Sequence, residues 1–162
     1  MSQPDFVARF AGIYEHSAWV AEEAAPLVAD SGDMEVIATV MADCVDNAAT
    51  EKQLELIRAH PDLAGKAQVA GELTADSTSE QSRAGLDQCS AEEYEMFQTL
   101  NTAYHDKFGF PFVMAVRNSS RTEILEAFGG RLKNDPDTEF ETALAEIHTI
   151  ARLRLQAMEE EQ

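Results

Sequence analysis

Three Ser-x-x-Glu patterns in the second half of the chain constrain its fold most strongly. They begin at Ser77, Ser90 and Ser120, and each places a glutamate three residues after the serine. This spacing is typical of a capping box, in which the hydroxyl and the carboxylate satisfy free amide groups at a helix start. Each pattern therefore predicts that a helix begins there.

Apolar residues at helical spacing extend this prediction over most of the remaining chain. Three further N-caps are predicted, at Asp33, Thr50 and Asp137, the last of these for a final helix. Two prolines mark interruptions. Pro26 should start or kink a turn, and Pro61 should close the helix that begins near Thr50.

One segment, 108–116, breaks the helical pattern. Its sequence, Phe-Gly-Phe-Pro-Phe-Val-Met-Ala-Val, is apolar but punctuated by glycine and proline, which predicts a buried extended loop or a short strand. The longest loop is expected over 62–77. We found no internal repeat and no linker, so the sequence predicts one all-α domain over residues 1–162, a bundle of about eight helices.

Charge and cysteine usage limit the partners and the compartment. The formal net charge of −18 repels polyphosphate, so nucleic acid is a poor partner. The same charge indicates solubility or adaptation to a salty cytoplasm. The chain has no membrane-spanning apolar run and no signal-peptide pattern at its start. Cys44 and Cys89 lack metal or redox spacing and are expected to be reduced thiols, which favours a cytoplasmic protein.

His60 is the first candidate for chemistry. It precedes Pro61 and therefore falls at a helix end, with Leu56 and Ile57 one turn behind it on the same face. The helix dipole favours the protonated imidazole and burial opposes it, so the pKa of His60 could lie near neutrality, as acid–base catalysis requires. A histidine that merely caps the helix end would have the same sequence.

Glu80 and Arg154 are the other two candidates, and each has an ordinary alternative. Glu80 would be the third helical residue of the Ser77 capping box, yet the surrounding 74–81 segment is rich in acceptors and free amides that could bind a ligand. Arg154 continues an apolar stripe of the last helix, so it must either extend to solvent or meet an anion in a pocket. Arg152 lies on a more polar face.

The backbone of 108–116 is a fourth candidate, because a buried non-helical loop leaves amide groups that a substrate carboxylate or carbonyl could bind. Its aromatic side chains are expected to be core. His16 and His105 have no second ligand at metal spacing, so no metal site is predicted.

Taken together, these segments resemble the 2-oxo-4-hydroxy-4-carboxy-5-ureidoimidazoline (OHCU) decarboxylases of urate breakdown, over about residues 10–155. Five motifs carry the resemblance in register: His60-Pro61-Asp62-Leu63-Ala64-Gly65, Ser77-Thr78-Ser79-Glu80-Gln81 before Ala84-Gly85-Leu86, Asn101-Thr102-Ala103-Tyr104, Lys107-Phe108-Gly109-Phe110-Pro111-Phe112, and Ile150-Ala151-Arg152-Leu153-Arg154-Leu155.

The resemblance implies an all-helical, cofactor-independent carboxy-lyase that forms S-allantoin and is usually a homodimer. It implies three catalytic residues: His60, Glu80 working beside it, and Arg154 rather than Arg152 as the substrate-binding arginine. The other positions implied to bind substrate are Pro61, Ser77 and Gln81, together with the backbone of Phe112, Val113, Met114, Ala115 and Val116. From the residues alone, a non-catalytic helical module that binds a ureide or a partner helix, or a ureide hydrolase, stays open.

Overall fold

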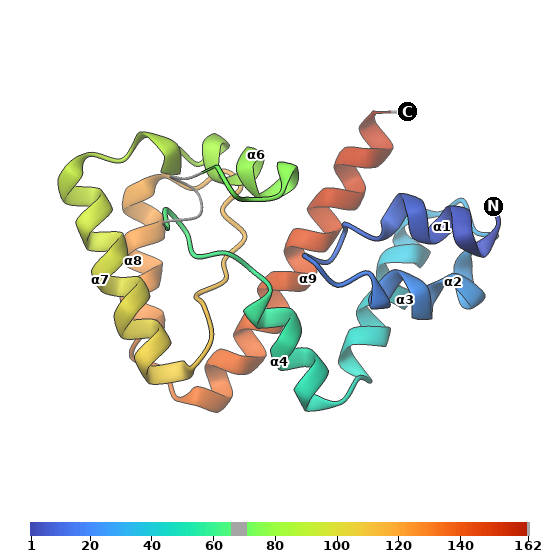
Figure 1. Cartoon of the computed structure of the whole chain (residues 1–162), viewed down its shortest axis with the longest axis horizontal. Coiled ribbons are helices and arrows are strands. Elements are labelled where there is room, and N and C mark those ends of the chain that lie inside the picture. The colour runs from blue at the N-terminus through green and yellow to red at the C-terminus, as the bar shows by residue number, and fades with distance from the viewer. Residues whose placement is uncertain (66–70, 162) are drawn as a thin grey trace. The chain divides into compact units, whose positions relative to one another are not determined.

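The computed structural model describes residues 1–65 and 71–161 (Figure 1). Within these ranges the chain forms α-helices and one short 3-10 helix and has no strand, so the expected all-α class is confirmed. The helices, in chain order, are α1 (Gln3–Phe10), α2 (Trp19–Val28), α3 (Met34–Asp46), α4 (Thr50–Arg58), α6 (Ala75–Arg83), η1 (Leu86–Gln88), α7 (Ala91–Phe108), α8 (Arg121–Arg131) and α9 (Pro136–Glu160).

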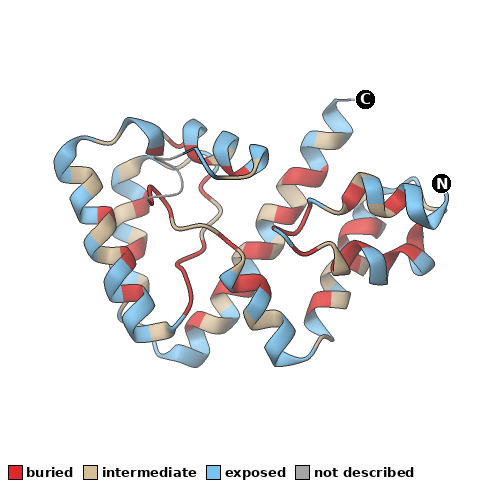
Figure 2. Cartoon of the chain, in the orientation of Figure 1, coloured by how far each residue is buried: buried red, intermediate tan, exposed pale blue. Residues whose placement is uncertain are grey.

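The chain divides into two compact units, and α9 contributes to both. Unit 1 comprises Met1–Ala59 and Ile147–Gln162, and unit 2 comprises His60–Glu146. In unit 1, α2 packs against both α1 and α3. The side chains that fill this packing, Phe6, Phe10, Val20 and Val45, are at most 1% exposed (Figure 2). That the whole chain folds as one domain stays a prediction.

The core of unit 2 is aromatic and centres on Tyr104 of α7. The Tyr104 ring meets Phe110, Phe112 and Phe128 edge to face, with centroid distances of 5.9, 5.5 and 5.9 Å. Phe112 also stacks on Phe128 at 3.9 Å, with 8° between the ring planes. Edge-on aromatic pairs are favourable beyond the apolar area they bury. The segment after α7 is therefore held in the core by its phenylalanines.

Two of the three predicted capping boxes are confirmed. Ser90 and Ser120 each accept the backbone N–H of a glutamate three residues later, and the glutamate carboxylate accepts the serine N–H in return. Asp33 is confirmed as the N-cap of α3, since its carboxylate accepts the N–H of Glu35 at 2.9 Å. These side chains supply acceptors for amide groups that have no partner inside the helix.

Other predicted boundaries are wrong by a residue or two. Helix α4 has Ala49 rather than Thr50 at its N-cap position. The last helix is capped by Asp135, whose carboxylate accepts the N–H of Thr138 at 2.9 Å, and not by Asp137. The reason is Pro136, which occupies the first turn of α9, where its missing N–H costs nothing.

Pro26 does not interrupt the chain as predicted. It lies inside α2, which continues to Val28. A proline at this position removes only the N–H that would bond to the carbonyl of Glu22, and both residues are exposed, so water can satisfy that carbonyl.

The predicted loop after α7 is confirmed as a buried, non-helical segment. Gly109 ends α7 in the left-handed conformation, with φ 75°, and Phe110–Val113 are buried without forming a strand. The long loop expected over 62–77 is shorter, because α6 begins at Ala75; residues 66–70 of that span lie outside the described residues. Across the described chain, no helix is both long and apolar enough to cross a membrane.

Candidate functional site

His60 is the first residue of unit 2 and lies just beyond the C-cap of α4, Ala59. Its side chain is buried, with 8% of the residue exposed. Both the position at a helix end and the burial agree with the sequence-based expectation. The residues that follow it, Pro61–Gly65, form a turn that is itself largely buried.

This turn is fixed by the side-chain amide of Gln81 on α6. The Gln81 Nε2 group donates to the carbonyl of Asp62 at 3.1 Å, and its Oε1 atom accepts the N–H of Ala64 at 2.9 Å. Gln81 is 2% exposed, so these bonds are shielded from water. The bonds place α6 directly against the turn that follows His60.

Two amides from α7 hold the next carbonyls of the same turn. Asn101 Nδ2 donates to the carbonyl of Leu63 at 3.1 Å, and Gln98 Nε2 donates to that of Ala64 at 2.8 Å. Three consecutive carbonyls are thus each bound by a primary amide. This support is needed because Ala64 has a φ of 50°, a left-handed conformation that is costly for any residue with a Cβ.

The start of α6 differs from the prediction and changes the interpretation of Glu80. The N-cap is Thr74, whose hydroxyl accepts the N–H of Ser77 at 3.2 Å, so the predicted Ser77–Glu80 capping box is wrong. Ser77 instead lies inside the first turn and is buried, with 4% exposed. Glu80 lies a turn further along, half-buried, and capping therefore does not explain its presence.

Arg154 belongs to unit 1 and is buried, with 6% exposed, so it does not extend to solvent. Its guanidinium donates to the carbonyls of Gly12 and Ile13 at 3.2 and 3.4 Å and pairs with Glu15 at 3.3 Å. Glu15 is 2% exposed, and a buried arginine needs such a counter-charge. Arg152 differs, since it forms an exposed ion pair with Glu35.

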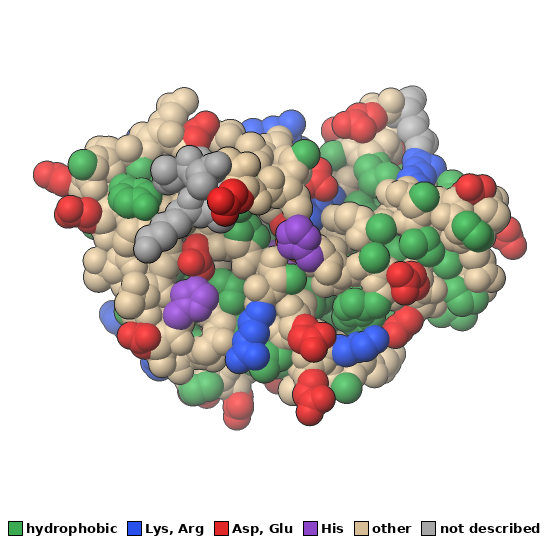
Figure 3. Space-filling view, viewed as in Figure 1, with side chains coloured by type: hydrophobic (Ala, Val, Ile, Leu, Met, Phe, Trp, Pro, Cys, Tyr) green, Lys and Arg blue, Asp and Glu red, His purple; other side chains and the backbone are tan. Residues whose placement is uncertain are grey.

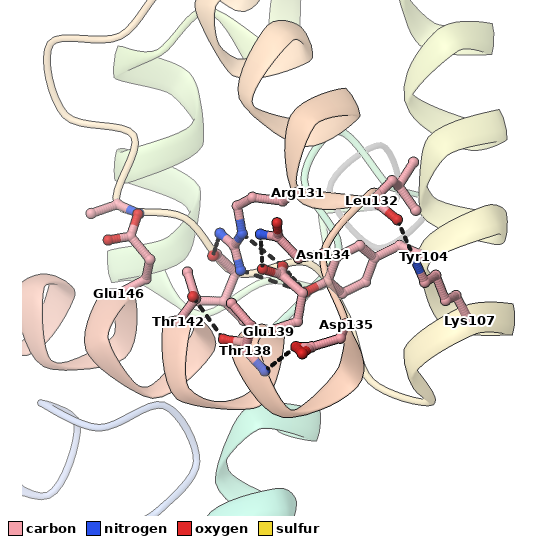
Figure 4. A network of polar contacts seen from close by, with 12 residues as sticks. Tyr104, Lys107, Arg131, Leu132, Asn134, Asp135, Thr138, Glu139, Thr142 and Glu146 are labelled. Atoms are coloured by element: carbon pink, nitrogen blue, oxygen red, sulfur yellow. Dashed lines mark hydrogen bonds and ion pairs between the residues drawn. The ribbon is translucent and has the colours of Figure 1, made fainter.

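The 112–116 segment is anchored by charged side chains that sequence reasoning did not single out. Arg131 of α8 donates to the carbonyl of Val113 at 2.5 Å and lies over the ring of Phe112 at 4.4 Å. Glu146 of α9 accepts the N–H of Ala115 at 3.3 Å. Figure 4 shows Arg131 and its neighbours converging on Glu139, which is fully buried.

Glu139 could have been found by the signal that revealed Arg154. It precedes Ala143 and Ile147 by four and eight residues, so it shares their buried face of α9. A charged residue at such a position must be paired. Glu15, the partner of Arg154, lies by contrast in a non-helical turn. Such a turn has no periodicity, so no sequence signal identified Glu15.

A cavity of about 380 Å³ lies on the α7 side of the turn in unit 2. Within it, Asp62 and His105 form a hydrogen bond of 2.8 Å. Among the described residues of the lining are two carboxylates, those of Asp62 and Asp106. Its lining residues are Asp62, Gly65, Gln98, Asn101, Thr102, His105 and Asp106.

The predicted site residues are therefore distributed unevenly between the two units. All of them except Arg154 belong to unit 2. Within unit 2, the bonds from Gln81 bring the polar side of α6 together with the turn after His60. The Phe112–Val116 segment is part of the same unit and has its own anchors, Arg131 and Glu146.

Comparison with known proteins gives consistent matches along the whole chain. Residues 1–156 match the OHCU decarboxylase family. The chain is 45% identical over 155 residues to the 2-oxo-4-hydroxy-4-carboxy-5-ureidoimidazoline decarboxylase of Haloferax volcanii, covering 96% of this chain and 89% of that protein. It is 43% identical to the protein of the same name from Halalkalicoccus jeotgali, covering 94% and 84%.

Two solved structures share the fold. The crystal structure of (S)-allantoin synthase superimposes with a TM-score of 0.77 at 34% identity, covering 97% of this chain and 50% of that one. The crystal structure of OHCU decarboxylase in the presence of (S)-allantoin gives a TM-score of 0.72 at 25% identity, covering 91% and 95%.

Proposed function

The chain belongs to the OHCU decarboxylase family, and we propose that it decarboxylates OHCU to (S)-allantoin in urate degradation. The observation that carries this proposal is the match to the family over residues 1–156, together with 45% identity to a decarboxylase over nearly the whole chain. The family resemblance implies catalytic roles for His60, Glu80 and Arg154, of which His60 and Arg154 are buried and Glu80 is half-buried.

The reaction needs a place for the electron pair of the breaking bond. In OHCU the carboxylated carbon neighbours a ring C=N bond, so cleavage of the carbon–carbon bond releases CO2 and moves the pair into the ring. The substrate is its own electron sink, and the protein's task is to orient the carboxylate, stabilise the charge on the ring and control the protons.

His60 and Glu80 are proposed to control the protons. His60 takes up the hydroxyl proton of the substrate, and Glu80 orients its imidazole. The carbon that lost CO2 becomes a carbonyl, and His60 delivers or relays a proton to one face of the neighbouring ring carbon that carries the ureido group, which sets the hand of the allantoin. The bonded turn at 62–64 supports this role, because it limits the positions that the His60 backbone can adopt.

Arg154 and the 112–116 amides are proposed to stabilise negative charge. A chain with a formal charge of −18 needs a local donor set to bind an anionic substrate. A guanidinium carries five N–H donors in a fixed fork, and its burial strengthens each hydrogen bond. Ser77 and Gln81 of α6 are proposed to bind the ring and ureido groups, and Pro61 to contact the ligand.

The test is an assay on OHCU generated in situ by enzymatic oxidation of urate and hydrolysis of the product. Circular dichroism follows the appearance of allantoin. With the protein present, one enantiomer should appear faster than in its absence. A slow racemic course that the protein leaves unchanged would disprove the proposed function.

A pair of matched histidine variants tests the assignment of His60. His60→Asn should lower kcat by about 10²–10⁴-fold, the usual contribution of a positioned acid–base group. His16→Asn is the control, because His16 is exposed and has no predicted role. Equal turnover by His60→Asn and the wild type would show that another group handles the proton.

The family resemblance also leads us to propose a homodimer and a cytoplasmic location. Sedimentation equilibrium of the purified chain measures the first, with twice the chain mass of 17.8 kDa expected. Fractionation of the source cells measures the second. A monomer that retains full activity would separate the oligomeric state from catalysis.

A further inference from the structure

Glu139 has an unusually complete set of partners for a buried carboxylate. With 0% of the residue exposed, it accepts hydrogen bonds from the Tyr104 hydroxyl at 2.6 Å, Arg131 Nε at 2.8 Å and Asn134 Nδ2 at 3.0 Å (Figure 4). A buried charge is tolerated only when it is paired and bonded in this way. The cluster holds the Arg131 guanidinium, itself only 13% exposed, in one orientation.

The hydroxyl of Tyr104 adds to this constraint. Burial first, and then the hydrogen bond to Glu139, raise the pKa of Tyr104 above its ordinary value of 10. The phenol therefore stays protonated and continues to donate to Glu139 across the working pH range.

The other edge of the Arg131 guanidinium contacts the 112–116 segment, whose amides are proposed to bind the substrate. Its Nη1 group donates to the carbonyl of Val113, and its central carbon lies 4.4 Å from the ring centroid of Phe112. Phe112 is in turn stacked on Phe128. Arg131 therefore holds the side chain of Phe112 in place and fixes the direction in which the carbonyl of Val113 points.

That direction determines where an amide points. No peptide bond of the described chain is cis, and in a trans peptide the C=O and the following N–H point in opposite directions. Because Arg131 holds the carbonyl of Val113, the N–H of Met114 points away from Arg131. No described residue accepts that N–H, whereas the next one, of Ala115, donates to Glu146.

We propose that Arg131, oriented by Glu139, is a positioning residue that directs the N–H of Met114 toward the substrate. This inference rests on the proposed function, and it selects one amide of 112–116 as the donor to an oxygen that becomes negative during decarboxylation. A preoriented amide stabilises developing charge because it needs no rearrangement when the charge forms.

The test compares Arg131→Lys with Lys107→Ala. Lysine keeps the positive charge of Arg131 but cannot bond Glu139 and Val113 with a rigid fork. Arg131→Lys should stay folded and lose about 100-fold in kcat with little change in KM, as expected when a transition-state contact is displaced. Lys107→Ala is the matched control, since Lys107 donates to the carbonyl of Leu132 beside the same cluster. It should leave kcat unchanged.

Nuclear magnetic resonance of the Met114 amide separates positioning from general stability. Addition of (S)-allantoin should move this resonance in the wild type and in Lys107→Ala but not in Arg131→Lys. If Arg131→Lys is unfolded, Glu139→Gln, which disturbs the orientation of Arg131, takes its place. Wild-type kcat in a folded Arg131→Lys, or a Met114 resonance of the active wild type that ignores (S)-allantoin, overturns the proposal. An inactive wild type instead disproves the proposed function.

Discussion

At the scale of single residues, Gln81 shows that a side chain can stabilise the backbone beside a candidate catalytic residue. Its amide forms one bond with the carbonyl of Asp62 and one with the N–H of Ala64, both in the turn after His60. The family resemblance implies contact with substrate for Gln81. The structure adds a mechanical role, because the turn contains Ala64 in a left-handed conformation that needs external support.

Gln81→Met should therefore lower stability as well as affinity. Methionine fills a similar volume but leaves the buried N–H of Ala64 without an acceptor, which costs about 1–3 kcal/mol. Gln98→Met is the control: it removes one bond from a half-buried side chain and should cost about 0.5–1.5 kcal/mol. Urea denaturation measures both. A raised KM with an unchanged free energy of unfolding would assign the Gln81 amide to substrate alone.

The burial of a charged residue was predictable where that residue interrupted an apolar stripe of a helix. Arg154 stood out because it continued an apolar stripe, and it is indeed buried. Glu139 obeys the same rule on the same helix. The hydrogen bonds to the 62–64 turn were not predictable, since Gln98 and Asn101 are polar residues on a helix, where polar residues are ordinary.

At the scale of elements, the start of α6 shows that the first residue of a helix is ambiguous when the sequence has two possible N-cap residues close together. Thr74 and Ser77 are three residues apart, and either hydroxyl could accept an amide of the first turn. The structure uses Thr74, which lengthens the helix by most of a turn and places Ser77 inside it. Pattern alone could not choose between them, because the choice depends on what buries Ser77.

Thr74→Ala should destabilise the protein by about 1 kcal/mol, the usual cost of losing an N-cap hydroxyl. Thr78→Ala is the matched control. Thr78 is exposed within α6, and alanine is a better helix former than threonine, so this change should be neutral or slightly stabilising. Thermal unfolding of both variants checks the pair. Equal stability of Thr74→Ala and the wild type would indicate that Ser77, and not Thr74, is the N-cap residue of α6.

The cap of α7 makes a prediction about pH. The Glu93 carboxylate accepts the N–H of Ser90 at 3.0 Å and pairs with Arg121 at 2.9 Å. These contacts, the Ser90 amide first, lower the pKa of Glu93 below its ordinary value of 4.5. A lowered pKa in the folded state means that the carboxylate stabilises the protein above pH 4.5, and that this contribution is lost as the pH falls.

Glu93→Gln should therefore unfold more easily than the wild type at neutral pH. The difference between the two should shrink as the pH falls below 4.5, because the wild-type carboxyl then becomes neutral as well. Urea midpoints measured from pH 7 downward follow this change. A difference that stays constant with pH would show that the charge of Glu93 contributes nothing.

At the scale of the whole molecule, helix content was predictable but the division of the chain was not. Capping signals and apolar spacing are local, so they located most helices within a residue or two. Unit 1 combines two segments far apart in sequence, 1–59 and the end of α9, whereas unit 2 is one continuous stretch. That pairing depends on long-range packing, which periodicity does not encode.

The strongest property of the whole molecule is its charge. The chain has thirty acidic residues and only twelve lysines and arginines, and Figure 3 shows acidic side chains scattered over the visible surface. Mutual repulsion at low salt opposes folding, and salt shortens its range from about 10 Å at 0.1 M to about 3 Å at 1 M. The denaturation midpoint should therefore rise steeply with KCl.

A charge-reduced variant separates screening from other effects of salt. We expect the combination of Glu55→Gln, Glu95→Gln, Glu141→Gln and Glu159→Gln, all at exposed positions, to unfold at a higher temperature than the wild type in 0.1 M KCl. The two proteins should converge as KCl approaches 1 M, because repulsion is then already screened. Parallel salt curves for both proteins would instead show that salt acts by exclusion from the protein surface, which strengthens apolar burial whatever the charge.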